Sequence, residues 1–139
     1  MHTLDYAAAT RVVAAAVDAA AALPLPITVA VLDHTREVKA LGRMDGAPTL
    51  TAEVAVAKAF TACSLGVGTH QTQAFTGHDG PFRGLEVLGG GRLCTIPGGL
   101  PLVRDGLVVA AVAVSGGSAE QDLQLAEVAL AALEQEVTA

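Results

Sequence analysis

The sequence predicts an α+β fold in which a five-stranded antiparallel sheet is flanked by helices. Segments rich in β-branched residues follow one another across short turns, as in hairpins, and helical segments stand at both ends of the chain and in its middle. Strands and helices do not alternate regularly, which disfavours a parallel doubly wound sheet. Since 139 residues make about one domain, we expect residues 1–139 to form a single domain.

The N-terminal third predicts a helix followed by a hairpin. Thr3 is the expected N-cap, with Asp5 in the first turn, and the Ala/Val run to Ala22 stops at the prolines of "LPLP". The β-rich segments "ITVAVL" and "EVKALGR" follow, separated by the polar "DHTR". This pattern predicts two antiparallel strands joined by a turn.

The middle of the chain predicts a second helix and a long loop. The helix opens at Thr49, after the turn residues of "DGAP", and ends near Gly66 in a left-handed conformation. It is nearly apolar all round, so we expect the sheet and another helix or subunit to cover it. The glycine-dense stretch from Gly77 to Gly91 predicts a long loop beside a binding region.

The last third predicts three strands and a closing helix. The strand candidates are "RLCTI", "PLV" and "LVVAAVAVS", and Asp105 and Gly106 suit a tight turn between the last two. Ser118 and Gln121 form an S-x-x-Q capping box for the closing helix. Its predicted buried face consists of Leu123, Ala126, Leu130, Leu133 and Val137.

Composition disfavours several classes of partner. The formal net charge of -6 and the 3% aromatic content disfavour nucleic acid and anionic membranes, because those partners need clustered Lys and Arg, and nucleic acid also needs aromatic stacking. The N-terminus lacks the basic region of a signal peptide, and Asp18 interrupts the alanine-rich run, so no leader or membrane span is expected. Cys63 and Cys94 form no CxxC motif and are expected as buried reduced thiols in a cytoplasmic protein.

The histidines offer no metal site by spacing. The four histidines show no i, i+4 pair and no Cys/His pattern, so we expect no metal. His70 and His78 flank the glycine-rich stretch and are candidates for an acid, a base or an axial haem ligand. The commoner alternative is a pair of solvated loop histidines.

Lys58 is the first candidate site residue. No acidic residue stands three or four positions away on its own helix, so its partner must lie elsewhere. Arg43 and Asp45, at the mouth of the same helix, are the natural candidates to surround it. A partly buried lysine of this kind can bind a carbonyl or move a proton. The alternative is a lysine that extends to solvent.

Two glycine-rich turns are further candidates. "PGGLP" places the amides of Gly98 and Gly99 between two prolines, and "SGG" leads through Ser115, Gly116 and Gly117 into a helix N-terminus. Both turns can present N–H groups to an oxygen ligand, and the second also favours a carboxylate through the helix dipole. The alternatives are a tight strand connection for the first turn and a self-capped helix for the second.

Five motifs in order, "VAVLD", "RMDGAP", "AVAKAFTA", "IPGGLPLVRDG" and "VAVSGGSAEQD", resemble the HbpS/GlcG-like haem-binding family. That family also supplies the C-terminal domain of PduO-type cobalamin adenosyltransferases. The resemblance covers nearly the whole chain. It implies a five-stranded sheet with packed helices, a homo-oligomer such as a dimer or an octamer, and a ligand such as haem. The family's first hairpin turn usually contains glycine, so "DHTREV" is expected to reshape it.

The resemblance also implies a pocket formed by the "RMDGA" turn, the lysine helix and the "PGG" loop. Arg43, Met44, Asp45 and Lys58 would then be ligand-binding residues. This grouping depends on the resemblance, because composition and spacing do not establish it.

Three hypotheses for function follow. The first is an oligomeric protein that binds haem or another carboxylate-bearing small molecule through Arg43, Lys58 and the glycine amides. The second is a cofactor-independent isomerase or lyase for a small oxygenated metabolite, in which Lys58 or Asp45 moves a proton while Arg43 and the Gly98 and Gly99 amides hold an oxyanion. The third is a structural oligomerisation domain. We rank binding first, because the charged residues suit a carboxylate and no nucleophile or cofactor fingerprint is visible.

Overall fold

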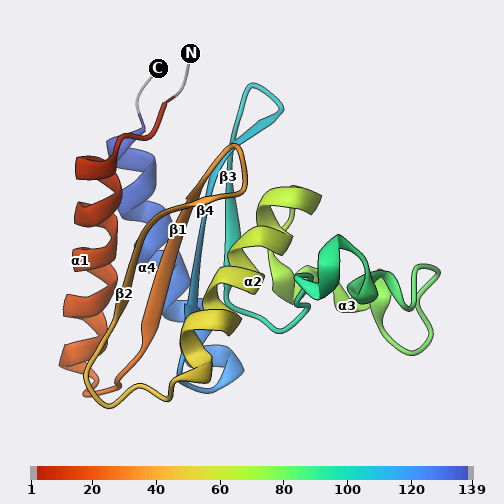
Figure 1. Ribbon diagram of the computed structural model, residues 1–139, viewed down its shortest axis with the longest axis horizontal. Coiled ribbons are helices and arrows are strands. Elements are labelled where there is room, and N and C mark those ends of the chain that lie inside the picture. Colours follow the sequence, from red (N-terminus) through yellow and green to blue (C-terminus); the bar gives the residue numbers. More distant parts are fainter. Residues whose placement is uncertain (1–2, 138–139) are drawn as a thin grey trace.

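Two hairpins pair with each other to form a four-stranded antiparallel sheet, in a computed structural model that describes residues 3–137 (Figure 1). Strands β1 and β2 form the first hairpin and β3 and β4 the second, and the order across the sheet is β2-β1-β4-β3. The predicted hairpins and antiparallel pairing are confirmed. The strands are β1 (Thr28–Asp33), β2 (Val38–Arg43), β3 (Gly99–Arg104) and β4 (Leu107–Ser115).

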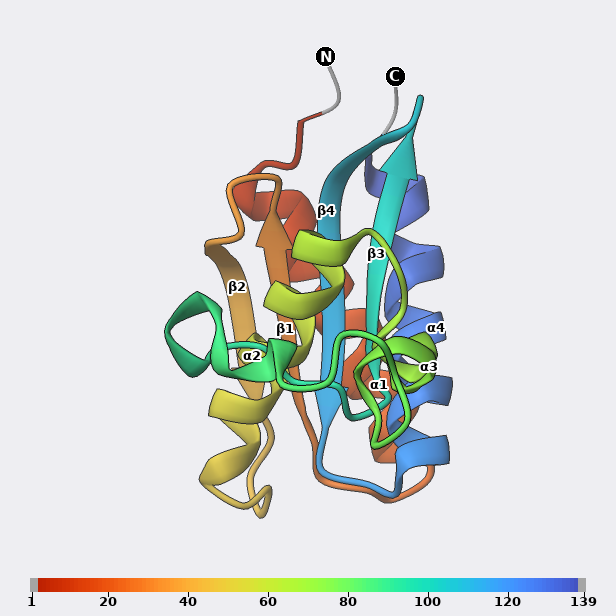
Figure 2. The ribbon, with the colours of Figure 1, turned by 90° about the vertical axis from the view of Figure 1, so that its right-hand side faces the viewer.

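Helices cover both faces of this sheet. Helices α1 (Tyr6–Ala22) and α4 (Ala119–Glu136) pack together on one face, and α2 (Leu50–Leu65) packs on the other (Figures 1 and 2). The central strands β1 and β4 are therefore buried on both sides, which explains their nearly continuous apolar sequences. Alanines of α2 allow that helix to lie close to the sheet.

Between α2 and β3, a segment of short helical turns extends away from the sheet and its three long helices. We call residues 73–91 the protruding segment, because they extend away from the sheet on the side of α2 (Figure 1). The segment contains α3 (Gln73–Thr76) and the single 3-10 turns η2 (Leu85–Val87) and η3 (Gly89–Gly91), and η1 (Thr69–Gln71) precedes it. The predicted irregular stretch is therefore confirmed, with brief helical turns inside it.

The prediction of a fifth strand is wrong. Residues 92–96, "RLCTI", form no strand. The backbone N–H of Cys94 donates to Thr61 Oγ1 on α2 at 2.7 Å, and the carbonyl oxygen of Thr95 accepts from the hydroxyl of Thr72 at 3.4 Å. Because side chains take up backbone groups that a neighbouring strand would pair with, the β-rich sequence stays irregular.

The helix starts follow local hydrogen-bonding rules, with one correction. Asp5, and not Thr3, caps α1, since its Oδ1 atom accepts from the N–H of Ala8 at 2.7 Å. The predicted capping box of Ser118 and Gln121 is present at the start of α4. The side chains of Asp5 and Ser118 each accept from an N–H group that the first helical turn leaves without a partner.

The predicted turns and helix ends also hold. Helix α2 ends at Gly66 with φ of 72°, as predicted for a left-handed stop. Asp105 and Gly106 have φ of 53° and 78°, which suits the tight turn between β3 and β4. The predicted buried face of α4 is confirmed in part, because Ala126, Leu133 and Val137 are buried while Leu123 and Leu130 are half-buried against the core. The helix also buries Asp122, Leu125 and Ala129.

Helix α2 is covered on its sheet side but not all round. Leu50 at its start is exposed. Among the described helices, none alone has the length and hydropathy to cross a membrane, although α2 together with residues 69–76, bent by 71° from it, meets that length and composition test as a pair. Cys63 on α2 is buried, Cys94 is half-buried, and both are free thiols.

Candidate functional site

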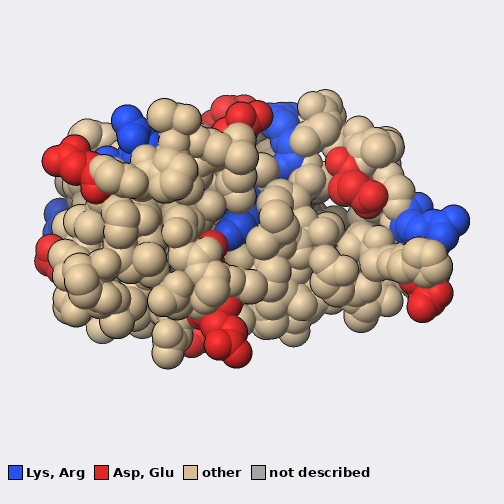
Figure 3. Space-filling view, turned by 90° about the horizontal axis from the view of Figure 1, so that it is seen from below, with Lys and Arg blue, Asp and Glu red and all other residues tan. Residues whose placement is uncertain are grey.

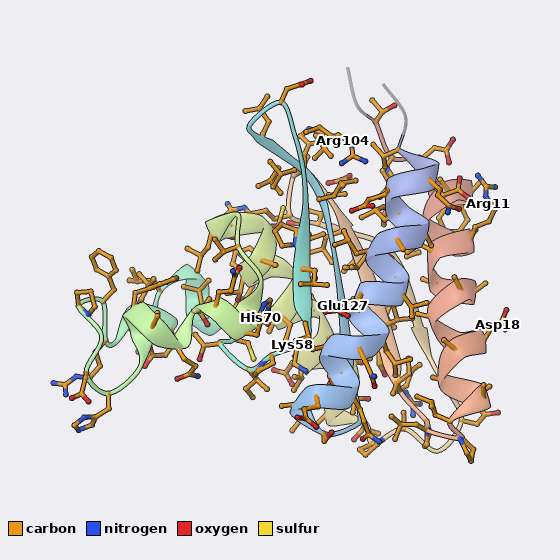
Figure 4. The ribbon with its side chains drawn as sticks, turned by 180° about the vertical axis from the view of Figure 1, so that it is seen from behind. Arg11, Asp18, Lys58, His70, Arg104 and Glu127 are labelled. Atoms are coloured by element: carbon orange, nitrogen blue, oxygen red, sulfur yellow. The ribbon has the colours of Figure 1, made fainter. Side chains whose placement is uncertain are left out.

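Lys58 lies inside the molecule and pairs with an aspartate of α4. Its side chain is 1% exposed, and Nζ donates to Asp122 Oδ2 and to the backbone carbonyl of Val114, both at 2.9 Å. Figure 4 shows Lys58 reaching from α2 toward the N-terminal part of α4. The contact therefore joins helices from opposite faces of the sheet at the end of β4.

Asp122 also caps its own helix. Its Oδ1 atom accepts from the N–H of Gly117 at 2.8 Å, while Gln121 Oε1 accepts from the N–H of Ser118 at 2.9 Å. A carboxylate at this position also interacts favourably with the positive end of the helix dipole. The amides of Gly117 and Ser118 are thus engaged within the chain, as in the self-capping alternative.

Gly98 and Gly99 let the start of β3 approach Lys58 closely. A Cβ atom on Gly98 would lie 3.0 Å from Lys58 Nζ, and one on Gly99 would lie 2.5 Å from the Lys58 carbonyl oxygen. Gly98 has φ of 123°, which disfavours any other residue. The N–H of Gly99 donates to Thr69 Oγ1 at 2.9 Å. The "PGG" loop therefore packs around the lysine and uses a glycine amide internally.

The hydroxyl of Ser115, in this region, has unused hydrogen-bonding capacity. Its side chain is buried, and its hydroxyl makes no hydrogen bond to any residue within 3–137. It pairs across the sheet with Thr28, whose own hydroxyl is bonded to Thr51 Oγ1 at 2.8 Å. We call Lys58, Gly98, Gly99, Ser115, Gly117 and Asp122 the lysine cluster.

The "RMDGA" turn does not supply the partner of Lys58. Arg43 pairs with Thr28, which pairs with Ser115, so Arg43 lies two strand spacings, about 10 Å, from the lysine cluster along the sheet. Its Nη1 atom donates to the carbonyl of Ala47 at 3.1 Å. The prediction that Arg43 and Asp45 surround Lys58 is wrong, because Asp122 occupies that place.

The other two residues of the turn have separate surroundings. The sulfur of Met44 accepts from the N–H of Ile27 at 3.4 Å, and Asp45 is exposed beside Gly46.

Gly116, in the second glycine-rich turn, has φ of 138°, and a Cβ there would lie 2.7 Å from the carbonyl oxygen of Pro26. Glycine is therefore required at position 116, because the chain segment that follows α1 passes close to it.

The two candidate histidines are both exposed. His70 lies on η1 at the base of the protruding segment (Figure 4). His78 lies within the segment, with Nδ1 3.1 Å from Asp79 Oδ1. Across residues 3–137 no three His, Cys, Asp or Glu side chains gather as they would around a metal ion.

An apolar groove opens where the protruding segment meets α2. It has a volume of about 360 Å³, and its lining side chains are Leu65, Phe75, Phe82 and Leu85. The rings of Phe75 and Phe82 meet edge to face, with centroids 6.3 Å apart. A binding region was predicted beside the glycine-dense stretch from Gly77 to Gly91, to which Phe82 and Leu85 belong.

The underside of the molecule carries scattered charges. Figure 3 shows isolated blue and red side chains separated by wide uncharged areas, and a hollow between the body and the protruding segment. This face holds no dense patch of Lys and Arg, which a nucleic-acid phosphate backbone would need.

The fold and these sites define a small α+β domain with a buried lysine–aspartate pair and an open apolar groove. The chain belongs to the HbpS-like family, since the model described as "Haem degrading protein HbpS-like" matches residues 4–131. The resemblance inferred from the five motifs is thereby confirmed.

Three similar proteins illustrate the range of this family. An uncharacterised 15.0 kDa protein from the dhaT-dhaS intergenic region of Citrobacter freundii is 36% identical over 92% of this chain and 90% of its own length. The corrinoid adenosyltransferase PduO of Salmonella typhimurium is 34% identical over 86% of this chain but only 35% of its own length. The crystal structure of a PduOC:heme complex superposes with a TM-score of 0.87 at 32% identity, covering 94% of each chain.

Proposed function

We propose that this chain is a small-molecule-binding protein whose ligand is haem or another carboxylate-bearing molecule with a large apolar body. The observation that carries the proposal is the groove of Leu65, Phe75, Phe82 and Leu85, which offers only apolar side chains to a ligand. The likeness to a protein solved as a haem complex supports the same conclusion. An apolar surface of this kind suits the ring of a macrocycle.

The side chains in and next to the protruding segment are of the chemical types that a haem site needs. A haem site needs apolar walls, a ligand for iron and cations for the propionates. The groove supplies the walls, His70 and His78 supply exposed imidazoles on the two sides of α3 in sequence, and Arg83 is an exposed cation in the same segment. When bound, haem supplies iron-based redox and oxygen chemistry, while these side chains bind and orient it.

We also propose that the protein is a homo-oligomer that uses the protruding segment. Within this segment Phe82, Val87 and Leu88 are 61%, 72% and 57% exposed. Exposed apolar side chains that lie close together favour a contact with another surface. A second copy at this position would also cover the open side of the groove.

The acid–base hypothesis receives less support from the arrangement of its residues. Lys58 is buried and donates to two acceptors of its own chain, and the Gly99 amide donates to Thr69. Asp45, the other proposed proton carrier, is exposed on a turn that makes no contact with the lysine cluster through any hydrogen bond or ion pair found in residues 3–137. The buried pair therefore favours a structural role for Lys58.

A hemin titration followed by absorbance tests the proposal. We expect a saturable, shifted Soret band that is lost in either His70→Ala or His78→Ala and weakened in Phe82→Ser. His34→Ala, which removes an exposed histidine from the first hairpin, is the matched control. A non-saturable spectrum that is identical in all variants would exclude haem as the ligand. Light scattering of the same samples checks for a mass greater than one chain.

A further inference from the structure

A second cleft lies between α2, the turn from β1 to β2, and the η3 turn. Its volume is about 380 Å³, within the usual range of small-ligand sites, roughly 300–1,000 Å³. Val38, Val56 and Phe60 provide an apolar lining. The cleft shares no lining residue with the apolar groove, so it is a separate site. Figure 2 shows the green segment that contains η2 and η3 crossing in front of β2.

Two arginines from distant parts of the chain meet at this cleft. The guanidinium carbons of Arg36 and Arg92 lie 4.9 Å and 4.1 Å from the ring centroid of Phe60, which is 3% exposed. Each arginine therefore makes a cation–π contact with the same buried ring. The ring holds both guanidiniums in place at the wall of the cleft.

Neither guanidinium is neutralised within the described chain. Arg36 Nη1 donates to Ser64 Oγ at 3.3 Å, and Arg92 Nε donates to the carbonyl of Gly89 at 3.0 Å. The ion pairs found among residues 3–137 include neither arginine. Each side chain keeps further N–H groups for a ligand, and the planar fork of arginine suits a carboxylate.

The backbone on both sides is shaped to bring these arginines together. Arg36 has φ of 70°, which is uncommon for a residue other than glycine, and its N–H donates to the Asp33 carbonyl at 3.0 Å. Gly90 and Gly91 have φ of 70° and 77°, although a Cβ at either position would meet nothing within 4 Å. Backbone conformation, and not crowding, therefore requires glycine in the turn that precedes Arg92.

Two carboxylates line the same cleft. Glu37 and Glu53 are exposed and belong to no ion pair found within residues 3–137. With two arginines and two glutamates, the lining has no net charge. A ligand with a carboxylate alone gains at the arginines but is repelled by the glutamates, whereas a ligand that also carries an amino group is attracted by both pairs.

We propose that this cleft binds a small amino-acid-like molecule. Its carboxylate is held by Arg36 and Arg92, its amino group is attracted by Glu37 and Glu53, and its apolar side chain lies against Val38 and Val56. The site is independent of haem binding in the apolar groove.

Calorimetric titration with the common L-amino acids tests this site. We expect at least one with a large apolar side chain, such as L-phenylalanine, to bind with a dissociation constant of about 1 mM or tighter. Hydrocinnamate, which lacks the amino group, and phenethylamine, which lacks the carboxylate, should bind more weakly. Failure of every amino acid to bind at about 1 mM or tighter, or equal binding of hydrocinnamate, would overturn the proposal.

Variants separate ligand binding from mere packing on Phe60. Arg36→Met and Arg92→Met keep an apolar stem over the ring, and each should weaken binding by about tenfold or more, the loss of one charged hydrogen-bonded contact. Glu53→Gln should weaken L-phenylalanine but strengthen hydrocinnamate, a reciprocal change that packing alone does not produce. Arg104→Met, outside the cleft, is the matched control and should bind as the unmodified chain does. Unchanged affinity in both cleft arginine variants, with folding verified by circular dichroism, would contradict the assignment.

Discussion

The Nζ atom of Lys58 lies 2.9 Å from Oδ2 of Asp122, and this contact connects a helix on one face of the sheet to a helix on the other. Lys58 Nζ also donates to the Val114 carbonyl, and Asp122 Oδ1 accepts from the Gly117 N–H. A buried ion pair contributes little net stability relative to apolar residues, but removing one partner leaves an uncompensated buried charge. The two side chains therefore act as a unit.

The first prediction concerns that unit. Lys58→Met leaves the Asp122 carboxylate buried without its cation, and we expect the free energy of unfolding to fall by about 3–5 kcal/mol. Urea unfolding measures this loss. In the double variant Lys58→Met with Asp122→Asn, the amide oxygen still accepts from Gly117 and no charge remains. A large part of the stability should return, and a double variant as unstable as the single one would contradict this account.

The second prediction concerns pH. Burial opposes ionisation of Asp33, but hydrogen bonds from Thr35 and the charge of Lys39 outweigh it, so the pKa of Asp33 is lowered in the folded state. A lowered folded-state pKa means that the stabilisation is fully present above the unfolded value, about 3.9, and is lost as pH falls through the folded value. The urea midpoint should therefore drop in acid, and less so in Asp33→Asn. Equal acid slopes in both proteins would exclude this contribution.

The third prediction distinguishes the observed helix cap from the one expected by sequence. Asp5→Ala removes the acceptor for the Ala8 N–H and should cost about 1 kcal/mol of folding free energy. Thr3→Ala should change stability far less, since Thr3 is exposed outside the helix. Thermal unfolding of both variants decides the matter, and Asp5→Asn should retain most of the stability.

Patterns of neighbouring residues were sufficient to predict those caps and turns that depend on interactions between neighbouring residues. The capping box at Ser118, the left-handed stop at Gly66 and the tight turn at Asp105 each depend on residues within a few positions of one another. The strand expected at residues 92–96 failed because its partners are side chains of α2 and the η1 region, which periodicity does not reveal. Four strands, and not five, are the result.

The sites depended on contacts that span the chain. Spacing indicated that the partner of Lys58 lies off its own helix, but it could not select Asp122, which is 64 positions away. Arg36 and Arg92 lie far apart in the sequence, and in the folded chain both guanidiniums pack on the ring of Phe60. The signal that was available, the polar stretch "DHTREV", predicted a reshaped first hairpin and not a binding cleft.

The pairing of β1 with β4 joins segments that are far apart in the sequence. Thr28 faces Ser115, so the two central strands come from near the start and near the end of the sheet-forming sequence. Each hairpin alone is a two-stranded sheet, which is only marginally stable in water. We therefore expect the centre of the sheet to close late, after the entropy of a long loop has been overcome, and on the ribosome to await synthesis of β4.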